Sequence, residues 1–100
     1  MWMQGKTVVI TGASSGMGKG IAQRLIVDYG CNVIGIARSE QKMKKFVEEL
    51  GFYAGKFSYR LFDVSVRENW ENFAAELKEN GTKIDVLINN AGILPKFKRF

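Results

Sequence analysis

The sequence has 100 residues, of which 46% are hydrophobic and 25% are charged, as in packed globular domains. This length predicts one small domain with a single core. The net charge is +5, but Lys96, Lys98 and Arg99 lie in the last five residues, and the rest of the chain has twelve basic against ten acidic side chains. A nucleic-acid-binding domain usually carries basic residues along a whole face. We therefore expect one domain over 1–95, a separate basic tail over 96–100, and no nucleic-acid partner.

The residue types that are missing exclude several kinds of site. The sequence has no histidine, which excludes Ser-His and Cys-His catalysis and histidine metal sites. A single cysteine, Cys31, cannot form an internal disulfide or a cysteine-based metal cage, and we interpret it as a small residue leading into a strand. No apolar stretch approaches the roughly 20 residues that span a bilayer, and the N-terminus lacks the basic segment of a secretory signal. We expect a cytoplasmic protein with no metal site and no membrane partner.

In chain order, the first half of the sequence alternates strand and helix twice. The β-branched run 7–10 predicts a buried strand. Apolar residues at four-residue spacing over 16–29 predict a helix, and the run 33–37 predicts a second buried strand. Over 43–50 the apolar residues follow the i, i+3, i+4, i+7 spacing of a helix, which Gly51 is expected to end.

The second half repeats this alternation. Residues 57–62 predict a third strand, and Ser65 followed by Glu68 has the form of a capping box at the start of a helix. That helix is expected to end at Asn80, and residues 84–88 predict a fourth strand. Strands alternating with helices predict an α/β fold with a parallel sheet. We expect a Rossmann-type doubly wound sheet with strand order 3-2-1-4, truncated after the fourth strand.

A glycine-rich stretch lies between the first strand and the first helix, where free backbone amides and the helix dipole favour a phosphate group. An ordinary glycine-rich turn is the simpler alternative. The triphosphate-binding pattern G-x-x-x-x-G-K-[ST] fails, because Ala13 and Gly20 stand at its two ends. The pattern G-x-G-x-x-G also fails, because three residues separate Gly12 from Gly16. The spacing T-G-x-x-x-G-x-G, from Thr11 to Gly18, does fit.

This spacing resembles the fingerprint of the short-chain dehydrogenase/reductase family. Asn89-Asn90-Ala91-Gly92 is similar to the family's N-N-A-G motif, and Asp63-Val64 is similar to its adenine-contacting pair. Alone, the N-N-A-G stretch could be a polar turn, and Asp63 could be an ordinary cap. All three motifs stand in register with the expected strand order, and the resemblance covers residues 5–95.

The resemblance implies a set of cofactor-binding residues. Asp63 would accept from the adenine amino group beside the Val64 backbone, and Asn89 would tie the strands together. The residues implied at the pyrophosphate and its neighbouring ribose are Gly12, Ser14, Ser15, Gly16, Met17 and Gly18. Those implied near the adenosine ribose are Asn90, Ala91 and Gly92.

The end of the second predicted strand indicates which dinucleotide is bound. An NAD site usually has an acidic residue there to hold the ribose 2′-hydroxyl. Here Arg38 and Ser39 follow the strand, and a guanidinium fork with a neighbouring hydroxyl suits a 2′-phosphate. The alternative is that Arg38 is a solvated residue opening the second helix. We predict NADP(H) over NAD(H), although Ser15 occupies the family's other usual basic position.

The family's catalytic Ser, Tyr and Lys, with the last two in a Tyr-x-x-x-Lys pattern, lie beyond the N-N-A-G motif. None of Tyr29, Tyr53 and Tyr59 is followed four residues later by lysine. We therefore expect the cofactor-binding part of an NADP(H)-dependent oxidoreductase that acts on a small-molecule substrate and is inactive as this chain alone. A non-catalytic nucleotide-binding or oligomerising module is the alternative. The strand 84–88 would be an apolar sheet edge, which predicts a homo-oligomer.

Overall fold

Four parallel strands form one sheet with the order β3-β2-β1-β4 in the computed structural model, which describes residues 3–13 and 16–90. The strands are β1 (Thr7–Thr11), β2 (Asn32–Ala37), β3 (Phe57–Leu61) and β4 (Val86–Asn89). The helices are α1 (Gly16–Val27), α2 (Glu40–Leu50) and α3 (Arg67–Glu79), with a 3-10 helix η1 (Gly51–Lys56) between α2 and β3. This is the Rossmann-type α/β sheet that the sequence predicts, with the predicted strand order.

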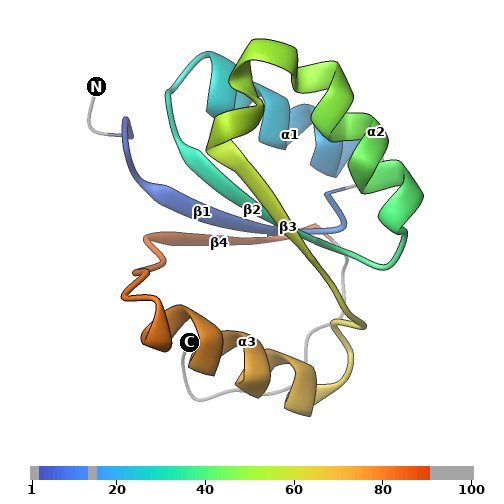
Figure 1. Cartoon of the computed structure of the whole chain (residues 1–100), viewed down its shortest axis with the longest axis vertical. Coiled ribbons are helices and arrows are strands. Elements are labelled where there is room, and N and C mark those ends of the chain that lie inside the picture. The colour runs from blue at the N-terminus through green and yellow to red at the C-terminus, as the bar shows by residue number, and fades with distance from the viewer. Residues whose placement is uncertain (1–2, 14–15, 91–100) are drawn as a thin grey trace.

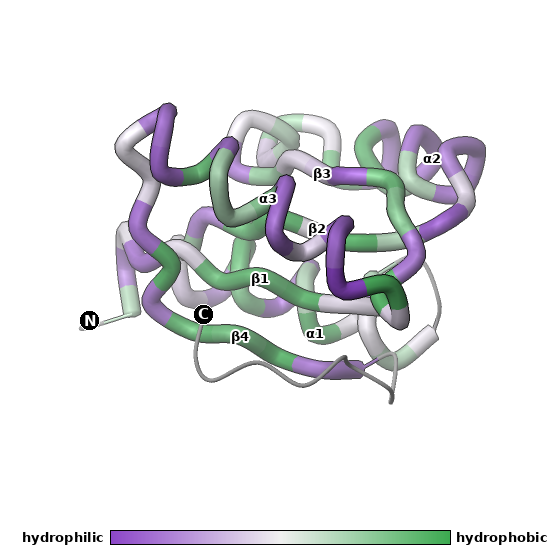
Figure 2. The backbone as a smooth tube through the Cα atoms, turned by 90° about the horizontal axis from the view of Figure 1, so that it is seen from below, coloured by the Kyte–Doolittle hydropathy of each residue, from purple (hydrophilic) through white to green (hydrophobic). Residues whose placement is uncertain are grey.

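The sheet separates two hydrophobic layers. Helices α1 and α2 cover one face and α3 covers the other (Figure 1). Alternate residues of each strand supply the two layers, so that Val8 and Ile10 pack toward α1 and α2 while Val9 packs toward Trp70 and Phe73 of α3. Because both faces of β1 are covered, it is apolar along most of its length, as Figure 2 shows for both β1 and β4.

The register of the strands brings their carboxyl ends together. Strand β1 pairs with β2 on one side and with β4 on the other, and Thr11 at its end lies opposite Ile36 and Asn89. Parallel strands place all the segments that follow them at this same edge of the sheet. The glycine-rich stretch, the start of α2, the segment after β3 and the end of β4 therefore meet there (Figure 1).

The capping box predicted at Ser65 and Glu68 is wrong. The helix cap is Val66, and no side chain makes a cap hydrogen bond there. Ser65 instead donates to Asp63 Oδ1 twice, from its hydroxyl at 2.6 Å and from its backbone amide at 2.9 Å. Ser65 lies one residue before the cap position, and its hydroxyl and its amide are both directed to the carboxylate two residues earlier rather than to the helix.

Other boundaries differ by small amounts. Strand β4 begins at Val86 rather than at 84, because Asp85 uses its carboxylate to accept from the Thr7 amide at 2.9 Å. Helix α1 ends at Val27 rather than at 29, and Gly30 follows it with a positive φ of 68°. The segment η1 was not predicted, and Phe52 at its start is 95% exposed. Within 3–13 and 16–90, no helix combines the length and the apolar character that a membrane crossing requires.

Candidate functional site

The glycine-rich stretch makes a tight turn from the end of β1 into α1. Gly12 has a φ of 67°, in the left-handed region that favours glycine, and its amide donates to the Ile36 carbonyl at 2.8 Å. Ala13 is fully buried beneath the turn, and α1 begins at Gly16. The first amides of α1 have no partner within their own helix, so they are available to an anion. The predicted residues Ser14 and Ser15 lie outside the described residues.

At Gly18, α1 lies in close contact with the segments that follow β1 and β4. A Cβ atom at this position would overlap the Gly12 carbonyl oxygen and would lie 2.6 Å from Asn90 Nδ2. Glycine is therefore required here by contacts within the protein. This packing lets the N-terminus of α1 stand directly over the edge of the sheet, as a dinucleotide-binding turn needs.

Met17 turns outward at the start of α1 and is 74% exposed, unlike most methionines of a folded core. An apolar side chain in this position offers a contact surface to a bound nucleotide. This exposed position is compatible with the predicted place of Met17 beside the pyrophosphate and ribose, because the described residues leave most of its side chain uncovered.

Asn89 and Asn90 make separate contacts with the β1 end. Asn89 Oδ1 accepts from the buried Thr11 hydroxyl at 3.0 Å, so this side chain links β4 to β1. Asn90 Nδ2 donates to the Gly12 carbonyl at 3.3 Å, which links the end of β4 to the glycine turn. The division of roles inferred from the resemblance placed Asn89 between the strands, and its contact agrees with that. Ala91 and Gly92 lie outside the described residues.

Gly35, in the middle of β2, is a structural requirement that the sequence analysis missed. A Cβ atom there would come within 2.8 Å of Met43 Cε and within 2.9 Å of both Ala13 Cβ and Phe57 Cζ. Because Gly35 has no side chain, Ala13 can pack against it under the glycine turn. A lone glycine inside a buried strand is a known sign of close approach, and the run 33–37 carried that sign.

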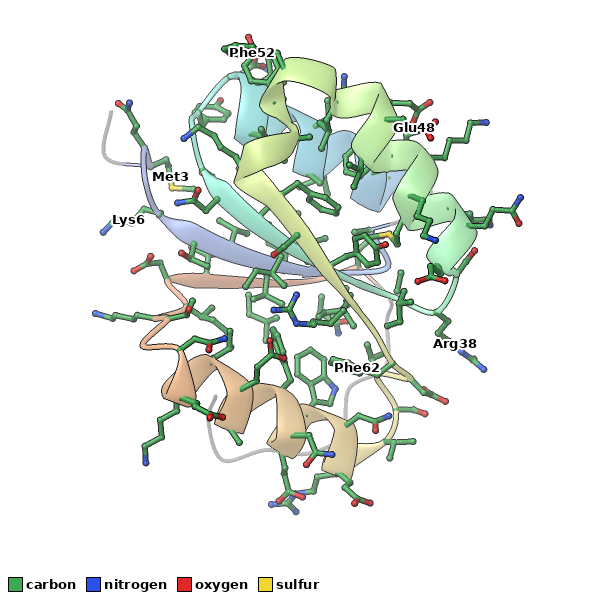
Figure 3. The ribbon with its side chains drawn as sticks, in the orientation of Figure 1. Met3, Lys6, Arg38, Glu48, Phe52 and Phe62 are labelled. Carbon is green, nitrogen blue, oxygen red and sulfur yellow. The ribbon has the colours of Figure 1, made fainter. Side chains whose placement is uncertain are left out.

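Arg38 and Ser39 follow β2 at the same edge. Arg38 is exposed and extends away from the sheet (Figure 3). Ser39 caps α2, with its Oγ accepting from the Lys42 amide at 3.3 Å. The capping bond uses an oxygen lone pair, so the hydroxyl proton is still able to donate to a ligand.

Asp63 and Val64 follow β3 and present both an acceptor and a donor. Two hydrogen bonds from Ser65, and to a lesser extent the positive charge of Arg38, hold the pKa of the Asp63 carboxyl below its ordinary value. The carboxylate is therefore ionised at neutral pH and can only accept. Ser65 occupies Oδ1, and no described residue donates to Oδ2 or accepts from the Val64 amide.

Together these residues fit the adenosine half of a dinucleotide. The start of α1 presents backbone amides, Asp63 and Val64 present an acceptor and a donor, and Arg38 presents a cation at the same edge of the sheet. Fold and site thus define an α/β protein of the Rossmann type.

Comparison with known proteins identifies the family within this class. The family model described as short chain dehydrogenase matches residues 6–100, and the chain belongs to the short-chain dehydrogenase/reductase family. A benzil reductase ((S)-benzoin forming) of Saccharomyces cerevisiae is 37% identical over 95 residues, which are 94% of this chain and 35% of the yeast protein. The resemblance inferred from the motifs is confirmed.

Solved structures of this family have the same fold as this chain. L-sorbose reductase from Gluconobacter frateurii, in complex with NADPH and L-sorbose, superposes with a TM-score of 0.78 at 28% identity, over 91% of this chain and 35% of that one. Actinorhodin polyketide ketoreductase with NADPH gives a TM-score of 0.74 at 34% identity, over 89% of this chain and 34% of that one. The chain therefore spans about a third of the length of the relatives it matches.

Proposed function

We propose that this chain binds the adenosine half of NADP(H) and forms the cofactor-binding part of an oxidoreductase that interconverts a carbonyl and an alcohol. The observation that carries the proposal is the meeting of the glycine turn, Arg38 and Asp63 at one edge of the sheet. Bound NADP(H) supplies a hydride donor or acceptor. The chain itself contributes binding and orientation, and it has no Tyr-x-x-x-Lys pair to move the proton.

Each part of the adenosine half of the cofactor would have residues to hold it. Backbone amides at the start of α1 would hold the pyrophosphate, with Met17 against the neighbouring ribose. Asp63 Oδ2 would accept from the adenine amino group. Arg38 would hold the ribose 2′-phosphate through its planar fork, assisted by the Ser39 hydroxyl.

Charge supports NADP(H) over NAD(H). The segment between β2 and α2 has Arg38 and Ser39 and no carboxylate that would repel a 2′-phosphate. Two relatives of known structure, L-sorbose reductase and the polyketide ketoreductase, were solved with NADPH. Their cofactor adds support to the charge argument.

Calorimetric titration of the chain with adenosine 2′,5′-bisphosphate and with adenosine 5′-phosphate tests the proposal without any need for the nicotinamide end. We expect the bisphosphate to bind more tightly. Arg38→Ala should remove this preference, at a cost of roughly 1.5–3 kcal/mol, the usual value of a hydrogen bond to a charged group. Lys45→Ala removes the same charge from the exposed side of α2 and should leave the preference unchanged. Equal affinity of the unaltered chain for the two nucleotides, or no binding of either, would overturn the proposal.

A further inference from the structure

Helix α3 holds the segment that carries Asp63 and Val64 through two side-chain donors. Asn69 Nδ2 donates to the Asp63 carbonyl at 3.1 Å, and Trp70 Nε1 donates to the Val64 carbonyl at 2.7 Å. The Val66 amide donates to the Asp63 carbonyl as well, at 3.2 Å. Both carbonyls of the segment are therefore turned toward α3, and their peptide planes are fixed.

The Trp70 donor is itself rigid. Trp70 is 1% exposed, and its ring meets Phe62 edge-on at 5.3 Å between centroids and lies 6.2 Å from Phe73. Phe62, on the α3 side of the sheet in Figure 3, directly precedes Asp63 in the chain. Because the indole is packed against these rings, its N–H has a fixed position. The Val64 carbonyl is therefore positioned by this donor.

Once these contacts are made, the segment has two groups left for a ligand. The plane that carries the Asp63 carbonyl also carries the Val64 amide, so Asn69 sets the direction of this amide, away from α3. The plane that carries the Val64 carbonyl also carries the Ser65 amide, which donates to Asp63 Oδ1, so Trp70 sets where the carboxylate lies. The remaining groups are the acceptor Asp63 Oδ2 and the donor on the Val64 amide. Adenine presents a matching pair on adjacent atoms, a donating amino group and an accepting ring nitrogen. Hypoxanthine reverses both, because it has a carbonyl oxygen and a ring N–H at those atoms.

We propose that Asn69 and Trp70 are positioning residues that set the selectivity of this site for adenine by fixing the peptide planes of Asp63 and Val64. The inference rests on the proposed function, because it assumes that the base of the nucleotide lies at this segment. It adds that the choice of base depends on two side chains of α3 that do not touch the ligand.

The test compares NADP⁺ with its hypoxanthine analogue by calorimetric titration of the full chain. Trp70→Phe keeps an aromatic ring in the cluster and removes the indole donor. Asn69→Leu keeps the branched shape of the side chain without a donor, at a partly exposed position where misfolding is a smaller risk. Leu77→Val is the matched control, since it disturbs the same cluster without removing a side-chain donor and changes neither ring that holds Trp70. Circular dichroism and thermal melting establish that each variant is folded.

We expect the unaltered chain to prefer NADP⁺, and each of the two donor variants to lower the ratio of affinities by about two- to tenfold, the effect of one neutral hydrogen bond. Leu77→Val should keep the ratio, even if it melts earlier. A loss of affinity that is equal for both nucleotides would show a merely structural role and overturn the inference. An unchanged ratio in Asn69→Leu would overturn it as well, whether or not Trp70→Phe folds. An unaltered chain without any preference would instead overturn the placement of adenine in the proposed function.

Discussion

Asn90 Nδ2 donates to the carbonyl oxygen of Gly12 at 3.3 Å, across 78 positions of the sequence. This contact joins the turn after β1 to the end of β4. Gly18 packs against both partners, so the two motifs that identify the family form one structural unit. A substitution at any of the three residues should therefore disturb the contacts of the other two.

Gly18→Ala is the most direct test of this unit. Its Cβ would overlap the Gly12 carbonyl and displace Asn90, and relieving this contact should cost about 1–3 kcal/mol of unfolding free energy, the range of overpacked interiors. Binding of adenosine 2′,5′-bisphosphate should weaken as well. Urea denaturation and titration measure the two effects.

Gly20→Ala is the control for that change, because a Cβ there meets nothing within 4 Å in the same helix. It should stabilise the chain by roughly 0.5–1 kcal/mol, since alanine loses less backbone freedom in a helix than glycine does. Equal stability of the two variants would show that the tight contact at Gly18 is absent in solution.

Gly35→Ala should destabilise the chain through a different set of contacts. The added methyl would meet Met43 Cε, Ala13 Cβ and Phe57 Cζ, all closer than 3.0 Å, and we expect a loss of about 1–3 kcal/mol. Because Met43 is flexible, adding Met43→Val to this variant should recover part of the loss, while Ala13 stays crowded. Denaturation of the single and double variants measures this, and a Gly35→Ala chain as stable as the unaltered one would contradict it.

Strand order and the glycine turn could be predicted because their signals are local. Buried β-branched runs mark the strands, and the spacing of Gly12, Gly16 and Gly18 marks the turn. The role of Gly35 could not be assigned, because its neighbours come from three other elements of the chain. The error at Ser65 has a related cause. A serine hydroxyl can bond to several neighbouring groups, and only the folded geometry shows that Ser65 bonds to the Asp63 carboxylate, at 2.6 Å.

Arg60 and Glu76 form an ion pair between β3 and α3 that should make stability depend on pH. Arg60 Nε donates to both carboxylate oxygens, at 3.0 and 2.9 Å, and this bonding holds the pKa of Glu76 below its ordinary value. A lowered pKa in the folded state contributes stability above the ordinary value of about 4.5, and the contribution is lost as pH falls further.

Glu76→Gln should therefore flatten the acid side of the curve of unfolding free energy against pH. At neutral pH the loss should not exceed about 1 kcal/mol, because the pair is partly exposed. Glu79→Gln, on the same helix and outside any ion pair between described residues, should keep the original slope. Urea denaturation between pH 3 and 7 measures all three chains, and parallel curves for the unaltered chain and Glu76→Gln would contradict the prediction.

Strand β4 should cause the 100-residue chain to self-associate. Of the described strands, only β1 pairs with β4, and Val86, Leu87 and Ile88 are half-buried rather than covered. The described residues place no second strand beside the outer edge of β4, so two copies can pair edge to edge there and bury these apolar side chains. Light scattering at micromolar concentration should show a dimer or a larger species.

Ile88→Lys places a charge on the edge and should reduce the association, whereas Val66→Lys, at an exposed apolar residue beside α3, should not. A monodisperse, folded monomer of the unaltered chain under these conditions would show that the edge of β4 is not a pairing surface.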